Sequence, residues 1–199
     1  MTLSLNQLLA MVWRSITAPR EGAAEVLALG VPKQALWLIL LIVVVLSIIL
    51  AQLTALIAAP GEVMMESILS NPVVAGSIQL GLLVVIIFAV FWIGRAMGGT
   101  GSFEESMLLM SWLQFIMVCV QVVQTVAMIT LPPLAGLIGI AALALFFWLM
   151  TTFVAVLHGF RSLAQVFVMI VVSGFTLAFL FSMLLAIFGF EMQMPTGGV

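Results

Sequence analysis

Charged residues are scarce in this sequence. Only 6% of its 199 residues are Asp, Glu, Lys or Arg, whereas 65% are hydrophobic, and the mean hydropathy is +1.43. A soluble domain carries about 25% charged residues. So few charges cannot keep so much apolar surface in water, which excludes a soluble protein and predicts an integral membrane protein.

The residue types that build metal and catalytic sites are also few. Cys119 is the only cysteine, His158 is the only histidine, and aspartate is absent. One cysteine excludes a disulfide within the chain, and together with one histidine it excludes a zinc site made of these two residue types. The lack of aspartate excludes a Ser-His-Asp triad. We therefore predict a protein that is not an enzyme and has no cofactor.

Long apolar runs make up most of the chain. A membrane span needs about 20 apolar residues, and runs without the alternation of barrel strands are helices. The sequence therefore predicts an all-α polytopic protein with an N-terminal segment, a five-helix membrane domain and a short tail, at residues 1–33, 34–190 and 191–199. The five spans are expected at about 35–58, 73–93, 106–130, 134–157 and 164–188.

The basic residues all lie on one side of this topology. With five spans, the side of the N-terminus carries Arg14, Arg20, Lys33, Arg95 and Arg161, and the other side carries no Lys or Arg. Loops in the cytoplasm have an excess of Lys and Arg. We therefore predict that the N-terminus is cytoplasmic and the C-terminus is outside.

Residues 3–16 have the pattern of an amphipathic helix. Its apolar face consists of Leu5, Leu8, Leu9, Val12, Trp13 and Ile16. The segment is too short to span a bilayer, and Arg14 follows the apolar run, whereas a signal peptide has its positive charge in front. We predict an interfacial helix on the cytoplasmic surface. The alternative is an amphipathic helix packed under the bundle.

The fifth span carries a ridge of small residues. Gly174, Ala178 and Ser182 recur at every fourth position, a pattern that lets helices approach closely in lipid. This ridge serves either packing within one subunit or a homodimer. The expected partners are therefore the lipid bilayer and other membrane proteins or a second copy of the chain.

The third span carries a polar face. Its members are Ser111, Gln114, Gln121 and Thr125. Amides in lipid need hydrogen-bond partners, and Gln52, Gln79 and Gln165 of other spans are candidates. The favoured interpretation is a structural network of side-chain hydrogen bonds, and the alternative is a hydrated pathway or a small-molecule cavity. No charged residue lies in the middle of a span, which argues against proton-coupled transport.

Residues 94–106, "GRAMGGTGSFEES", form a glycine-rich connection between the second and third spans. The segment matches neither G-x-x-x-x-G-K-[ST] nor G-x-G-x-x-G and has no lysine, so we expect no nucleotide and no nucleic acid as a partner. Ser102 and Glu105 have the spacing of a capping box that starts the third span. We interpret the glycines, among them Gly98, Gly99 and Gly101, as residues that let the chain turn sharply.

Methionines cluster on the side opposite the basic residues. Met64 and Met65 lie between the first two spans, and Met192 and Met194 follow the last. Thioethers are suitable ligands for Cu(I), so copper handling is a minor alternative. Chance placement in a chain with 14 methionines explains them more simply.

Two motifs resemble a known family. The first is W-x-x-x-x-x-P at residues 13–19, and the second is GG-x-G-S-F at residues 98–103. With five spans, this order is similar to the Yip family of Ypt/Rab-interacting proteins, particularly its bacterial members. The resemblance implies a five-helix membrane domain with a cytosolic N-terminus, here in a bacterial inner membrane. The Rab-linked traffic of eukaryotic members is not carried over, because only 33 residues precede the first span.

These features favour a non-enzymatic membrane component that acts as a scaffold, in assembly or in membrane organisation through helix contacts. A small passive channel or a transporter subunit, which would use the polar face of the third span, is the alternative.

Overall fold

The computed structural model describes residues 4–58 and 71–187. These residues form the helices α1 (Leu5–Thr17), α2 (Pro19–Leu27), α3 (Lys33–Ala58), α4 (Pro72–Ala96), α5 (Phe103–Thr130), α6 (Pro132–His158) and α7 (Leu163–Ile187). The five helices α3 to α7 are each long and apolar enough to cross a membrane. The predicted all-α class with five spanning helices is therefore confirmed.

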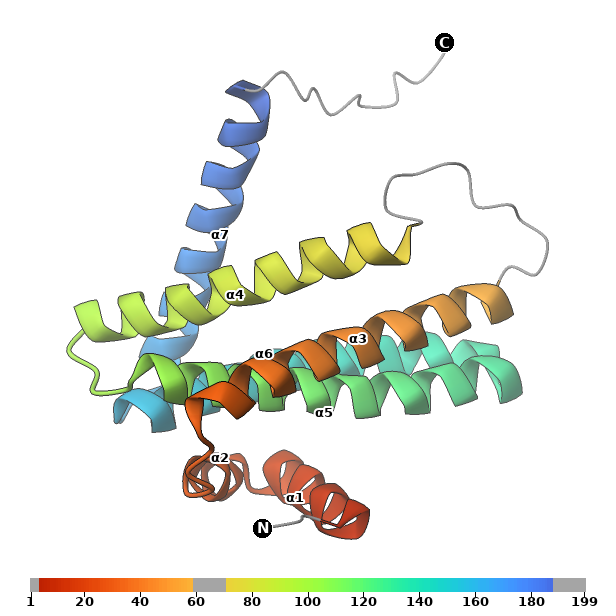
Figure 1. Cartoon of the computed structure of the whole chain (residues 1–199), viewed down its shortest axis with the longest axis horizontal. Coiled ribbons are helices and arrows are strands. Elements are labelled where there is room, and N and C mark those ends of the chain that lie inside the picture. Colours follow the sequence, from red (N-terminus) through yellow and green to blue (C-terminus); the bar gives the residue numbers. More distant parts are fainter. Residues whose placement is uncertain (1–3, 59–70, 188–199) are drawn as a thin grey trace.

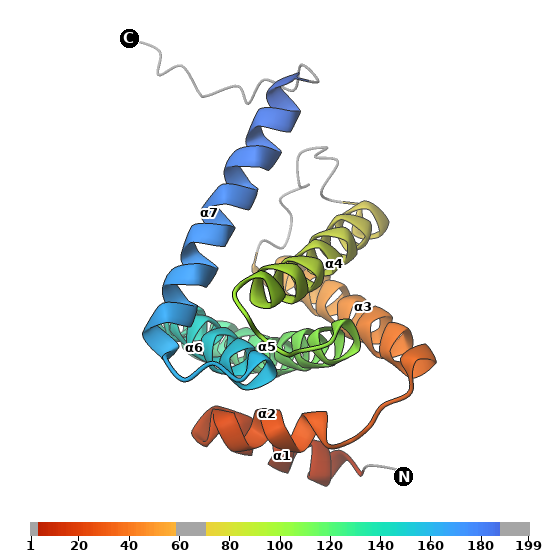
Figure 2. The ribbon, with the colours of Figure 1, turned by 90° about the vertical axis from the view of Figure 1, so that its left-hand side faces the viewer.

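The helices are arranged in layers around a central pair (Figures 1 and 2). α5 and α6 run antiparallel, with α3 and α4 on one side and α1 and α2 on the other. α7 follows α6 and rises steeply away from the other long helices (Figure 2). The result is a bundle in which one spanning helix stands apart.

Local signals begin and end the helices. The Ser102 hydroxyl accepts the Glu105 N–H at 3.2 Å, and the Glu105 carboxylate accepts the Ser102 N–H at 2.8 Å, so a capping box starts α5. Asn71 caps α4, and Pro132 lies in the first turn of α6. Gly159 has φ +72° and ends α6, because glycine adopts this left-handed conformation without strain.

The packed core lies at one end of the bundle. At this end, which we call the basic end, α3, α5 and α7 begin and α4 and α6 end, next to Lys33, Arg95 and Arg161. Residues 106–113 of α5 and 151–155 of α6 are buried throughout. Of the most apolar window of each helix, 56% is buried in α5 but only 17% in α4 and in α7.

α5 is longer than the hydrocarbon of a bilayer. Its 28 residues make a helix about 42 Å long, about 12 Å more than the hydrocarbon thickness of a bilayer. About eight residues of α5 therefore extend beyond the hydrocarbon. The buried residues 106–113 lie near the start of α5, so other parts of the protein cover this helix at the basic end.

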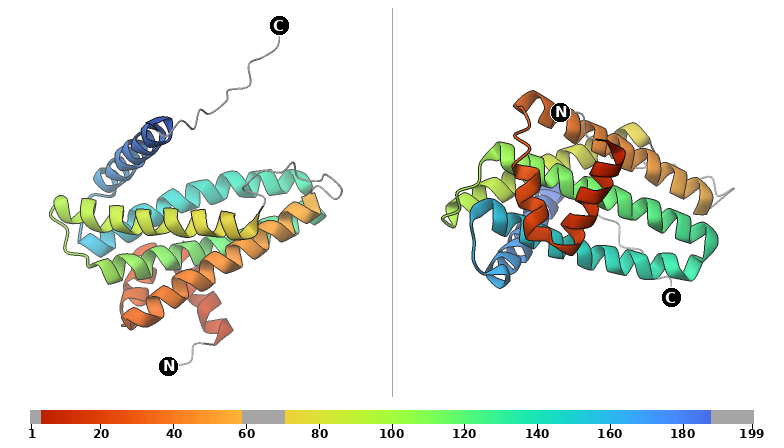
Figure 3. Two further views of the ribbon diagram at one scale, coloured as in Figure 1. Left: turned by 45° about the horizontal axis from the view of Figure 1, so that its top comes forward. Right: turned by 90° about the horizontal axis from the view of Figure 1, so that it is seen from below.

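α1 and α2 supply part of that cover. They cross beneath α5 and α6 (Figure 3). The Trp112 indole donates to the Ser15 hydroxyl at 3.0 Å, and both residues are buried. A Cβ at Gly22 would lie 2.6 Å from the Ser15 Cα, so α1 and α2 touch backbone to backbone. The short helices are therefore an integral part of the core.

The apolar face of α1 is divided between two environments. Val12 is buried, and Leu8 and Ile16 pack against the core. The exposed side carries Leu5, Leu9 and Trp13. Half of the apolar face thus packs under the bundle, which is the alternative that the sequence left open. The other half is exposed and is available for a second contact.

Candidate functional site

His158 is the centre of the most constrained polar site. This last residue of α6 is 2% exposed. The Gly101 N–H donates to Nδ1 at 3.3 Å, and Nε2 lies 3.1 Å from the Val90 carbonyl oxygen. Because Nδ1 accepts, the ring proton is on Nε2, which donates to the carbonyl. Both ring nitrogens are hydrogen-bonded to backbone groups. The neutral imidazole therefore links α6 to α4 and to the loop before α5.

The glycines of this loop fit around the imidazole. A Cβ at Gly94 would lie 2.1 Å from Nε2, and one at Gly99 would lie 2.5 Å from Nδ1. At Gly101 the nearest side-chain atom would be 2.7 Å away. Only Gly98, with φ +88°, needs the conformational freedom of glycine. In this loop the left-handed backbone is therefore at Gly98, whereas Gly99 and Gly101 allow the close approach of His158 and Leu157.

The remaining signature residues connect the same helices. The Thr100 N–H donates to the His158 carbonyl at 3.4 Å. The Phe103 ring lies 4.7 Å from that of Phe88 and 6.0 Å from that of Phe91, centroid to centroid. The loop is thus bonded to α6 and packed on α4, and it fixes the start of α5 between them. We call residues 94–103 the glycine loop.

The polar face of α5 is only partly connected. Thr125 shares a hydrogen bond with Thr54 of α3 at 2.8 Å. Gln79, one of the three candidate partners for this face, instead donates to Ser47 of α3 at 2.6 Å. The Ser111 hydroxyl is buried and has no hydrogen-bond partner among the described residues.

Two amides of this face are half-buried. In the described part of the chain, neither Gln114 nor Gln121 has a side-chain hydrogen bond, whereas the neighbouring Gln124 donates to the Ala135 carbonyl at 3.2 Å. The predicted continuous network is therefore replaced by separate contacts to α3 and α6.

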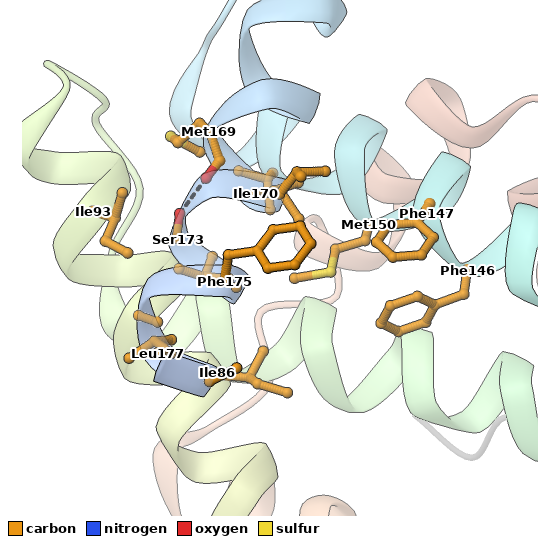
Figure 4. Close-up of a pocket in the computed structure, with 16 residues that line it drawn as sticks. Ile86, Ile93, Phe146, Phe147, Met150, Met169, Ile170, Ser173, Phe175 and Leu177 are labelled. Carbon is orange, nitrogen blue, oxygen red and sulfur yellow. Dashed lines mark hydrogen bonds between the residues drawn. The ribbon is translucent and has the colours of Figure 1, made fainter. Parts of the chain in front are cut away.

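The small-residue ridge of α7 borders an apolar cleft of about 380 Å³ between α4, α6 and α7 (Figure 4). Gly174 and Ala178 line it, while Ser182 is exposed farther along α7. No atom lies within 4 Å of a Cβ built at Gly174. No described helix of the chain therefore packs tightly on this part of the ridge.

The methionines considered for copper lie outside the described residues. They are Met64, Met65, Met192 and Met194. Among the residues that are described, no three His, Cys, Asp or Glu side chains come together as a metal site.

Comparison with known families bears on the sequence signatures. The Yip1 domain matches residues 13–186, most of the chain, from Trp13 through the glycine loop. Neither curated proteins nor solved structures gave a match. The helices fit a multi-pass protein of the lipid bilayer. The match over most of the chain, together with this architecture, shows that the protein belongs to the Yip1 domain family.

Proposed function

We propose that the protein is a non-enzymatic scaffold or organising component of the membrane. The observation that carries this proposal is that His158, Glu104 and Glu105, the groups around the glycine loop that could act as an acid or a base, are committed to structure. His158 is saturated by backbone groups, and Glu105 belongs to the capping box. The described ion pairs are Lys33–Glu104 at 2.9 Å and Arg14–Glu25 at 3.0 Å. The clefts beside α7 contain no acid or base among their lining residues.

We further propose that α4 provides an association surface. Large apolar side chains recur along its outer side at spacings of four, three and seven residues, which places them on one face of the helix. They are Ile78, Leu82, Val85 and Trp92, between 48% and 65% exposed. A stripe with this spacing suits a second helix. The partner is another membrane protein or a second copy of the chain.

Photo-cross-linking in the membrane tests this surface. With p-benzoylphenylalanine in place of Trp92, we expect a defined protein adduct on a denaturing gel, because the partner helix lies against the stripe. The matched control is the same replacement at Phe179 of α7, which is 69% exposed and lies outside the stripe. The association proposal is wrong if p-benzoylphenylalanine yields only lipid adducts both at position 92 and, in a second variant, in place of Leu82.

The orientation proposed for this scaffold places the basic end in the cytoplasm of a bacterial inner membrane. The collection of all Lys and Arg residues at the N-terminal side supports it. In a Cys119→Ser background, Ser162→Cys should react with an impermeant maleimide only in inside-out vesicles, and Asn71→Cys only in right-side-out vesicles. Both positions are exposed and lie at opposite ends of the bundle. The reverse labelling pattern would refute this orientation.

The polar face of α5 gives less support to a channel or transporter subunit. Ser111 and Thr125 are buried, and none of the four residues of that face lines the clefts beside α7. A scaffold therefore remains the better proposal.

A further inference from the structure

Two clefts border α7. The first part is the apolar cleft between α4, α6 and α7 (Figure 4), and a second part of about 760 Å³ lies between the end of α4 and the first half of α7. The two parts share the wall residues Ile93, Met169, Ser173 and Leu177. The two parts are therefore adjacent, and we call them together the α7 groove, which reaches from mid-bundle to the basic end.

The walls of the α7 groove offer almost no polar contact. The Ser173 hydroxyl donates to the Met169 carbonyl (Figure 4), and the Thr176 hydroxyl donates to the Val172 carbonyl at 2.9 Å. These hydroxyls are satisfied within α7 and need no outside partner. Sites of this volume commonly hold small molecules, and the remaining wall suits one that is apolar over most of its length.

The walls of the groove differ in the size of their side chains, and the small residues of α7 leave space between the helices. α7 contributes the small residues Gly174 and Ala178, while α4 and α6 point Ile86, Phe146 and Met150 toward it across the gap (Figure 4). Because α7 tilts away from the bundle (Figure 1), the groove stays open along the apolar part of the molecule. A flexible hydrocarbon chain can enter it from the surrounding lipid.

Two arginines lie close in the chain to the residues that line the groove at the basic end. Met97 and Gln165 line it there. The exposed Arg95 lies two residues before Met97 in the chain, and the exposed Arg161 lies four residues before Gln165. Neither arginine takes part in the two described ion pairs. The acids nearest to Arg95 in sequence are Glu104 and Glu105, and both are engaged, in an ion pair and in the capping box. The charge therefore complements an anionic group held at the mouth of an apolar groove.

We propose that the α7 groove binds one anionic glycerophospholipid from the leaflet at the basic end. An acyl chain lies between α4, α6 and α7, and the headgroup phosphate contacts Arg95, Arg161 and the Gln165 amide. Arginine is well suited to phosphate because its guanidinium donates two parallel hydrogen bonds. The site is separate from the association surface on α4 and does not depend on it.

Native mass spectrometry tests the headgroup part. The protein in mild detergent is equilibrated with equal amounts of phosphatidylglycerol and phosphatidylcholine that have the same acyl chains. We expect one retained phosphatidylglycerol, favoured about tenfold or more over phosphatidylcholine, since charge-assisted contacts distinguish the two. The double variant Arg95→Gln/Arg161→Gln should lose this preference. The control Arg14→Gln/Arg20→Gln, which removes the same charge elsewhere, should keep it.

A second pair of variants tests the groove. Ala178→Leu fills the space beside α7 and should abolish the retained lipid. The matched control Ala144→Leu, at an exposed position of α6 that does not line the groove, should leave it bound. Gly174→Val is a second filling variant if circular dichroism shows that Ala178→Leu is misfolded.

Three results would overturn the proposal. One is equal retention of both lipids by the unaltered chain, which is the behaviour of ordinary bilayer lipid. Another is retention of phosphatidylglycerol by the arginine variant and the filled variants alike. The third is a lipid-free dimer that Ala178→Leu disrupts, because a second copy would then occupy the groove.

Discussion

Gly94→Ala is expected to lower the free energy of unfolding by about 3 kcal/mol, because overpacking and a broken buried hydrogen bond act together. The new Cβ would lie 2.1 Å from Nε2 of His158. The ring cannot move aside freely, since the Val90 carbonyl and the Gly101 N–H hold it on opposite edges. Displacing it leaves the Gly101 N–H buried without a partner. Unfolding followed by circular dichroism in mild detergent measures the loss.

Two glycines serve as controls for this substitution. Gly81 lies in the same helix and has no atom within 4 Å of a built Cβ, so Gly81→Ala should be neutral or stabilising by up to about 1 kcal/mol. Gly98→Ala meets no neighbour but has φ +88°, and it should cost about 1 to 2 kcal/mol through backbone strain. Equal effects of Gly94→Ala and Gly81→Ala would contradict the close contact with His158.

A double-mutant cycle identifies the imidazole as the cause. His158→Ala removes the obstacle, so Gly94→Ala should cost much less in that background than in the unaltered chain. Contacting residues show such non-additivity, commonly about 0.5 to 3 kcal/mol. Strict additivity would mean that Gly94 is required for another reason.

The glycine loop separates what could be predicted from sequence from what could not. Ser102 and Glu105 are three residues apart, so their capping box follows from local spacing. Gly101 and His158 are 57 residues apart, and their contact requires that α6 return to the end of α4. The sequence contains both the glycines and a single histidine. Nothing local indicates that the glycines are adjacent to the ring.

The same distinction applies to the apolar residues. Five long runs predict five spanning helices because a bilayer demands that length. Hydrophobicity alone does not distinguish lipid from protein as the neighbour, so the burial of Val12 and the exposure of Leu9 on one helical face were not predictable. The separation of α7 from the bundle is likewise a matter of tertiary packing. Gln79 pairs with Ser47 and not with the α5 amides for the same reason.

Trp112→Ala is expected to release α1 and α2 from the bundle. The indole is 9% exposed, its ring lies 5.5 Å from that of Phe115, and it donates to Ser15. Removal of a buried aromatic side chain costs about 3 to 5 kcal/mol. This lost stability concerns the contact between α5 and α1. Trypsin should therefore cleave faster after Arg14 and Arg20, and the midpoint of unfolding should be lower.

Further substitutions separate the ring from its hydrogen bond. Trp112→Phe keeps most of the packing and should cost only about 1 kcal/mol, because a serine hydroxyl in a helix can turn to a backbone carbonyl. Gly22→Ala pushes α2 away from Ser15 and should expose the same cleavage sites. Trp148→Ala, at a tryptophan that is 53% exposed on α6, is the matched control and should leave cleavage unchanged. Two results would show that Trp112 does not hold the two short helices against the core. One is equally fast cleavage of Trp148→Ala and Trp112→Ala, and the other is no increase in the cleavage of Trp112→Ala.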